Sequence, residues 1–131
     1  MVGGRQGAFL QYMNVDIQFS TFVGAAEGLE LDACRDTSEV QNSVFSGGNC
    51  DLRGDGTAYE VEWNGFDNGA GCGILGAFST LGDPLFVASP ADLHLQVGSP
   101  MIDAADPAYE DPDGSDADLG RWGGPEALGA P

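Results

Sequence analysis

The residues whose types and spacing best suit chemistry are four aspartates near the end of the chain. Asp111, Asp113, Asp116 and Asp118 lie close together in sequence, with Gly114 among them. Carboxylates spaced around a glycine are typical of calcium-binding loops, because Ca²⁺ prefers oxygen ligands and the glycine permits a sharp turn. We therefore predict a calcium site at these four aspartates.

This loop is not an EF-hand, and it has an alternative interpretation. An EF-hand requires a bidentate glutamate at its twelfth position, which here is Trp122. Asp103 and Asp106, which precede the loop, could add ligands. In the alternative interpretation, the aspartates close turns by accepting hydrogen bonds from nearby backbone amides and add charge to the surface.

The three cysteines offer a second kind of chemistry. Cys50 and Cys72 could form a disulfide if they stack on successive layers of the fold, because stacked positions lie within bonding range. They could equally be unpaired cysteines that stack inside the fold, and Cys34 is left over in either case. A cysteine–histidine metal site is not expected. The chain has no two cysteines separated by two residues, and it has a single histidine.

The elements that must position these residues follow from an internal repeat. Three stretches align at a nearly constant step, namely 15–24, 39–48 and 60–69. A step of about 20 residues is typical of a solenoid, in which each repeat buries its apolar face only by stacking on its neighbours. The matching columns are Phe22, Phe45 and Phe66; Ile17, Val40 and Val61; Gln18, Gln41 and Glu62; and Leu29, Cys50 and Cys72.

The repeats predict a parallel β-helix. Their β-branched and aromatic segments are short and are separated by Gly, Asn and Asp turns, so each coil would add one rung to each sheet. The three phenylalanines would then stack in the core, and Trp63 would also point inward. Short polar side chains such as Ser20, Ser43 and Asn64 fall at a turn, where they can satisfy backbone groups.

Composition excludes several partners. The 131 residues contain 21 acidic side chains against four basic ones, which gives a formal charge of −17. Such a chain should not bind nucleic acid, because phosphate binding requires Lys or Arg, and it should instead attract cations. We expect no membrane insertion, since no segment approaches the ~18 apolar residues that a spanning helix needs.

Three segments after residue 80 carry a family resemblance. Asp83-Pro-Leu-Phe-Val87, residues 93–104 and residues 111–120 resemble the end of bacterial right-handed parallel β-helix repeat proteins, which have pectate-lyase-like superfamily architecture. The resemblance implies an all-β fold, a short right-handed parallel β-helix of three to four coils with an irregular C-terminal cap. Residues 1–80 would form the coils, and residues 81–131 would form the final coil and an acidic cap or tail.

The resemblance also implies a functional class. We expect a non-catalytic structural or carbohydrate-binding segment of a secreted or cell-surface bacterial protein, stabilised by calcium and facing a polysaccharide or cell-surface ligand. The alternative is the C-terminal part of a polysaccharide lyase or hydrolase whose catalytic coils lie upstream. A lyase needs a basic residue to remove a proton, and the coils offer only Arg5, Arg35 and Arg53. We therefore assign no catalytic residue to this segment.

The start of the chain suggests a longer native protein. Residues 8–22 already match a coil, and nothing before them would cover its open edge, which natural proteins normally protect. We expect this chain to be a C-terminal piece, which would explain why no signal peptide precedes it. The open first coil could also allow self-association.

Overall fold

The computed structural model describes residues 6–11, 14–24, 27–32, 38–47, 50–54, 60–67, 76–89 and 91–124, with only the backbone for residues 6–11, 27–32 and 50–54. These residues form β-strands and turns, without a helix among them. The strands are β1 (Gln6–Gln11), β2 (Asp16–Gln18), β3 (Thr21–Val23), β4 (Glu27–Asp32), β5 (Glu39–Gln41), β6 (Val44–Ser46), β7 (Cys50–Gly54), β8 (Glu60–Glu62), β9 (Gly65–Phe66), β10 (Thr80–Leu81), β11 (Phe86–Ala88) and β12 (Asp92–Leu95).

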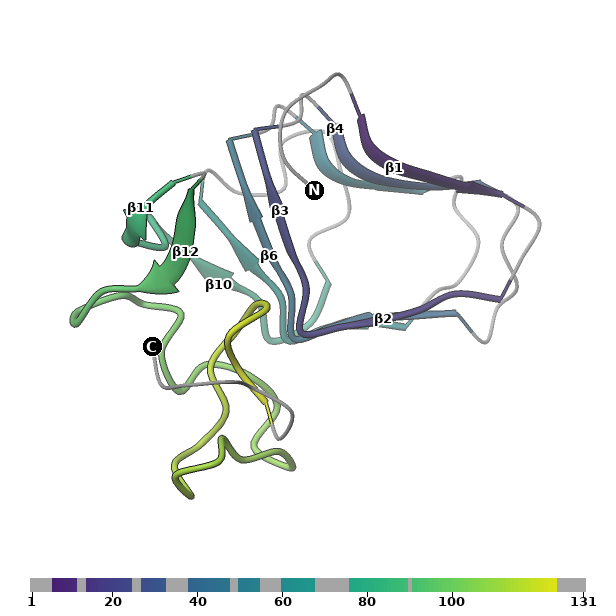
Figure 1. Ribbon diagram of the computed structural model, residues 1–131. Helices are drawn as coiled ribbons and strands as arrows, with labels where there is room; N and C mark the ends of the chain where they lie inside the picture. Colours follow the sequence, from purple (N-terminus) through teal and green to yellow (C-terminus); the bar gives the residue numbers. More distant parts are fainter. Residues whose placement is uncertain are drawn as a thin grey trace.

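The first ten strands form three parallel sheets. Their orders are β1-β4-β7, β2-β5-β8 and β3-β6-β9-β10, so each coil of the chain adds one strand to each sheet. Figure 1 shows these sheets around a common interior, with β1 and β4 above, β2 below, and β3 and β6 on one side. The predicted all-β fold with parallel sheets is confirmed, and this arrangement is consistent with stacked coils.

The predicted register of three columns is also confirmed, and two of these columns are apolar. Val40 pairs with Ile17 on one side and with Val61 on the other. Phe45 lies between Phe22 and Phe66, and its ring stacks on theirs with centroid distances of 4.9 and 5.3 Å. Val40 and Phe45 are fully buried, so these two columns form the core of the coils.

The predicted column of Leu29, Cys50 and Cys72 is wrong in the step from Leu29 to Cys50. Leu29 of β4 pairs with Leu52 of β7, whereas Cys50 pairs with Glu27. Leu29 and Leu52 are separated by the same step as the first two phenylalanines, and the step shortens only after β7. The predicted column used the shorter step one coil too early, which placed Cys50 out of register.

One corner of the coils is built from left-handed residues. Phe19, Asn42, Trp63 and Phe78 occupy successive coils and have φ between 46° and 56°. As predicted, short polar side chains follow them and satisfy the turn: the Asn64 amide nitrogen donates to the Val40 carbonyl at 2.8 Å, and its oxygen accepts the Ser43 amide at 3.0 Å.

Trp63 itself does not point into the core. It is only half-buried and stacks on Phe78, whose side chain is 61% exposed, with ring centroids 4.4 Å apart. A left-handed residue turns the chain between two strands, so its side chain leaves the alternation that places neighbouring residues inside.

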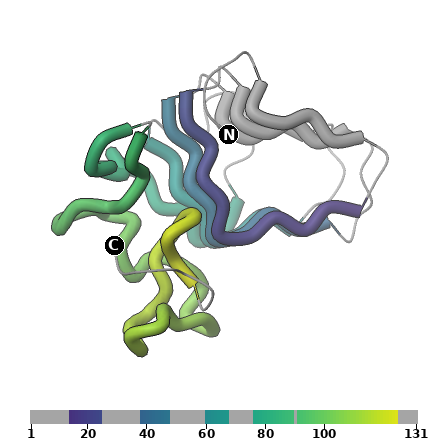
Figure 2. The backbone as a smooth tube through the Cα atoms, in the orientation of Figure 1, coloured from purple at the N-terminus to yellow at the C-terminus, as the bar shows by residue number. Residues whose placement is uncertain are grey.

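After β10 the chain leaves the parallel sheets. Strands β11 and β12 form an antiparallel pair, and the tail segment, defined here as residues 98–124, continues in turns. Figure 2 shows this segment beside the coils, with its end near the corner between β2 and β3. The structure thus places the acidic cap along the flank of the stack.

The tail segment and one strand of the coils share a second apolar core, separate from the phenylalanine column. Val44 of β6 packs with Leu95, Met101, Ala105, Ala117 and Leu119, all of which are buried. Val44 points away from the phenylalanine column because neighbouring strand residues face opposite sides. The outer face of the sheet β3-β6-β9-β10 therefore serves as the docking surface for the tail segment.

Close approach at this surface depends on glycine. A Cβ atom at Gly65 of β9 would lie 2.4 Å from the Met101 sulfur, and one at Gly120 would lie 2.7 Å from the Thr21 hydroxyl. Gly120 also has a φ of 90°, which side chains disfavour. Both positions let the backbones of coil and tail meet.

We predict that Phe45→Ala lowers the free energy of unfolding by about 3–5 kcal/mol, because it leaves a cavity between two stacked rings. Urea denaturation followed by circular dichroism measures this change. Val97→Ala is the matched control, since Val97 is 99% exposed and its truncation should change stability by no more than about 0.5 kcal/mol. Equal effects of the two substitutions would contradict a core built on the phenylalanine column.

Candidate functional site in the acidic tail and on the outer face of the coils

All four predicted calcium ligands belong to the tail segment, and two of them are buried in it. Asp118 is 1% exposed and Asp111 is 8% exposed. Asp111 accepts the Gly124 amide through Oδ1 at 2.6 Å and the Asp118 amide through Oδ2 at 3.2 Å. Asp118 accepts the Asp103 amide through Oδ1 at 2.8 Å. These carboxylates therefore organise the backbone around them.

The other two predicted ligands are exposed. Asp113 accepts both the backbone amide and the hydroxyl of Ser115, at 3.0 and 2.6 Å, so it closes a turn as the alternative interpretation expected. Asp116 is part of a short antiparallel bridge with Glu110. Within the described ranges, no three His, Cys, Asp or Glu side chains are grouped closely enough to hold a metal ion.

Burial and mutual repulsion make the inner pair costly to ionise. Burial raises the pKa of Asp118 to about 6, and the negative charges of Asp111, Asp103 and Asp113 contribute to this rise, against the lowering effect of the Asp103 amide. Burial also raises the pKa of Asp111. No basic side chain in the described part of the chain forms an ion pair with either carboxylate.

The inner pair offers a cation suitable chemistry but few ligands. Asp118 Oδ2 is buried and has no hydrogen-bond partner, and an orphaned carboxylate oxygen suits a hard cation such as Ca²⁺. Asp111 could share the ion through lone pairs that its two amide bonds leave available. Backbone carbonyls and water would have to complete the coordination.

The tail segment is tied to the coils by hydrogen bonds over long sequence separations. Asn42, at the left-handed corner, accepts the Asp106 amide at its side chain and the Gly120 amide at its carbonyl, both at 2.9 Å. The Arg121 amide donates to the Thr21 hydroxyl at 3.0 Å. These contacts reach the first two coils, and sequence patterns do not reveal pairs so far apart.

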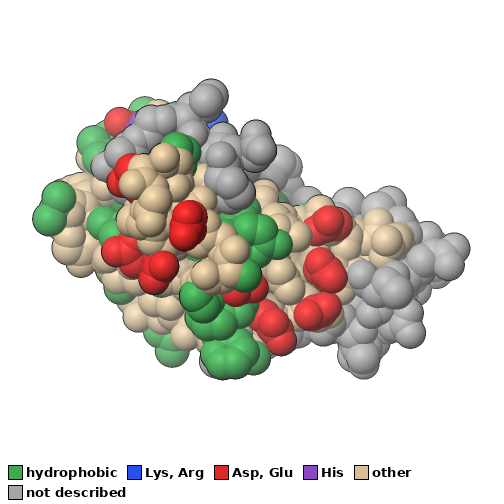
Figure 3. All heavy atoms as spheres, turned by 90° about the horizontal axis from the view of Figure 1, so that it is seen from below, with side chains coloured by type: hydrophobic (Ala, Val, Ile, Leu, Met, Phe, Trp, Pro, Cys, Tyr) green, Lys and Arg blue, Asp and Glu red, His purple; other side chains and the backbone are tan. Residues whose placement is uncertain are grey.

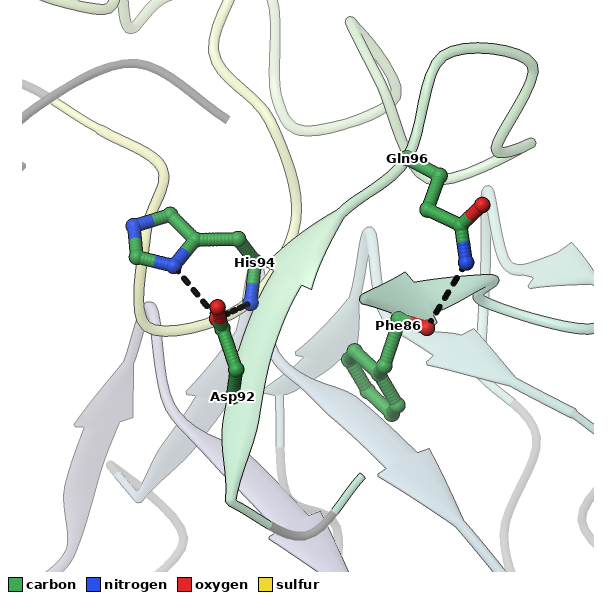
Figure 4. A network of polar contacts seen from close by, with 4 residues as sticks. All are labelled: Phe86, Asp92, His94 and Gln96. Atoms are coloured by element: carbon green, nitrogen blue, oxygen red, sulfur yellow. Dashed lines mark hydrogen bonds and ion pairs between the residues drawn. The ribbon is translucent and has the colours of Figure 1, made fainter. Parts of the chain in front are cut away.

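An aromatic contact ties the end of the tail segment to β12. In Figure 4 the Nδ1 atom and the backbone amide of His94 both face Asp92 Oδ1, at 2.6 and 3.0 Å. These bonds hold the pKa of Asp92 below its ordinary value. The Trp122 ring stacks on His94 at 3.8 Å, and Arg121 lies 5.0 Å from the same ring. His94 is thus half-buried under Trp122.

A row of carboxylates on the outer face of the coils was missed from the sequence. Asp16, Glu39 and Glu60 pair in register across β2, β5 and β8. Figure 3 views this side, where acidic side chains form a row beside a hydrophobic patch. Partial burial, followed by the charges of Glu60 and Asp16, raises the pKa of Glu39. The repeat steps that align Phe22, Phe45 and Phe66 also align this row, so the sequence did contain the signal.

A second row lies on the same face. Gln18, Gln41 and Glu62 are in register two residues further along the same strands. Glu62 adjoins the corner at which Trp63 stacks on Phe78. Gln41 is buried, at 8% exposure. The carboxylate row, the less buried Gln18 and Glu62, and this aromatic pair form a surface that we call the coil face.

Some predicted features lie outside the described residues. Cys72 is one of them, and for Cys50 only the backbone is described, so the disulfide stays a prediction. The side chains of Arg5, Arg35 and Arg53 also lie outside the described part of the structure. The described ranges contain no helix long and apolar enough to cross a membrane.

Comparisons with known proteins add no assignment. No family model matches the sequence, no curated protein matches it, and no solved structure matches the chain. The resemblance of the tail phrases to β-helix repeat proteins therefore stays a prediction.

The raised pKa of Asp118 predicts a pH dependence in the presence of a chelator. The protonated form favours the fold, so this contribution is complete below the unfolded pKa near 4 and is lost as pH rises through about 6. Between pH 4 and pH 7, the free energy of unfolding of the wild type should therefore fall. In Asp118→Asn this fall should be smaller by on the order of 2 kcal/mol. Urea titrations across this range measure the difference.

Asp113→Asn is the control for this prediction. The two bonds from Ser115 lower the pKa of Asp113, and its side chain is exposed. Its charge contributes least to the raised pKa of Asp118, so its removal should flatten the curve much less than Asp118→Asn. Parallel pH profiles for the wild type and Asp118→Asn would show that Asp118 does not titrate as the geometry indicates.

Proposed function

We propose that this chain is a non-catalytic binding and structural segment of a right-handed parallel β-helix, carried by a secreted or cell-surface bacterial protein. The coil face binds polysaccharide, and calcium stabilises the tail segment. The handedness, the location and the ligand class come from the resemblance of the tail phrases, and the stacked parallel sheets agree with it.

The coil face is the single observation that carries the binding role. Its carboxylate row repeats once per coil, so it offers acidic groups at a regular spacing of about 4.8 Å, with the amide of Gln18 beside them. Sugar hydroxyls can donate to carboxylates and can both donate to and accept from amides. The exposed ring of Phe78, held against Trp63, adds an apolar surface for the C–H face of a sugar.

The same face argues against catalysis in this segment. The only arginine among the described side chains, Arg121, belongs to the tail segment. A lyase needs a basic residue to remove a proton. Rows of polar side chains without a basic residue beside them therefore favour a structural or binding role over a lyase.

We predict that the chain is retarded in affinity electrophoresis through gels that contain a soluble polysaccharide. Neutral glucan, a polyuronate and an amino-sugar polymer would be compared at fixed ionic strength. Trp63→Asn should weaken retardation about tenfold, because it removes the stacked pair of rings from the coil face. Asparagine already occupies the equivalent corner at Asn42, so the substitution fits the left-handed backbone.

Val97→Ala is the control, since it truncates an exposed apolar side chain in the tail region instead of on the coil face. Equal retardation of both variants and the wild type would place binding elsewhere on the chain. No retardation by any of the three polymers would refute the carbohydrate-binding role. Cleavage of a polymer by the wild type would favour the enzymatic alternative.

A further inference from the structure

We propose that a divalent cation of calcium's type, bound by Asp118 and Asp111, locks the tail segment onto the first two coils. This inference rests on the calcium component of the proposed function and adds what the cation controls. Without the cation, the tail segment would undock from the sheet β3-β6-β9-β10, while the stacked coils would stay folded.

The first argument is an unmet electrostatic requirement. Two carboxylates are buried in the same turn region, and the described part of the chain supplies no basic side chain to pair with them. Burying a charge is costly unless it is paired or coordinates a metal. Asp118 Oδ2 is enclosed and has no hydrogen-bond partner among the described residues, so a cation from solution would satisfy this oxygen.

The second argument is mechanical. Asp118 lies two residues before Gly120, whose amide donates to Asn42, and three before Arg121, whose amide donates to Thr21. Asp111 accepts the Gly124 amide. A cation that fixes both carboxylates would therefore fix the short run of backbone that makes these contacts with the first two coils.

The type of ion follows from the ligand set. Asp103 and Asp113 add negative charge near the inner pair, but the described side chains do not form a group of three or more ligands. Magnesium gives up its hydration waters reluctantly and demands near-ideal octahedral geometry, whereas calcium accepts irregular coordination by carboxylates and backbone carbonyls, which suits an enclosed pair of aspartates better. We therefore expect calcium to act at lower concentration than magnesium.

Amide hydrogen exchange of the full chain at pH 7.5 tests the lock, with NMR resolving single residues. Samples in EDTA, in CaCl₂, in MgCl₂ and in NaCl of matched ionic strength would be compared. Calcium should increase protection of the Gly120, Arg121 and Gly124 amides about tenfold or more at saturating concentration. The amides of Val44 and Gly65, which bond within the coils, should change little.

Asp118→Asn supplies the decisive variant, because it removes the charge of the orphaned oxygen while keeping an acceptor for the Asp103 amide. Its tail amides should no longer respond to calcium. Asp83→Asn, at an exposed turn before β11, should respond like the wild type. Circular dichroism would verify that both variants keep their strands.

Three results would overturn the lock: no calcium response in the wild type, an equal response to NaCl, or an undiminished response in Asp118→Asn. Calcium binding by isothermal titration without added protection would overturn the lock and leave the calcium component standing. Absence of binding would remove both. Polysaccharide binding by the coil face is measured separately, so the lock can fail while that function survives.

Discussion

The structure depends first on the stacking of one coil on the next through columns of similar apolar side chains. Phe45 is enclosed because Phe22 and Phe66 lie directly on either side of it, and Val40 is enclosed in the same way by Ile17 and Val61. A single coil contains too few apolar residues to bury its own interior. The register of the coils, and with it every row on their outer surface, therefore follows from this repeated contact.

The tail segment depends on the coils and also constrains them. Its apolar core includes Val44, and its contacts extend from Phe19, beside Gly124, to Gly65, beside Met101. It therefore spans the first three coils along their flank. Elements held only by nearest neighbours can separate one at a time, and a segment that crosses several of them makes their separation more cooperative.

The sequence predicted the parts of the fold that repeat. The columns of Phe45 and Val40 were visible because their spacing recurs twice, whereas the column of Leu29 failed because the step changes only after β7. The carboxylate row of Asp16, Glu39 and Glu60 followed the same steps and was overlooked. Docking of the tail segment could not be predicted, because the contact between Thr21 and Arg121 joins residues that share no period.

Burial gives the carboxylates of this chain two different physical roles. On the coil face, like charges about 4.8 Å apart repel one another, but water and salt surround Asp16 and Glu60 and weaken that repulsion. Asp118 is buried inside the tail segment, and no basic side chain among the described residues compensates its charge. A fold with a formal charge of −17 can thus tolerate a dense acidic surface, while the position of its tail segment depends on what neutralises two enclosed aspartates.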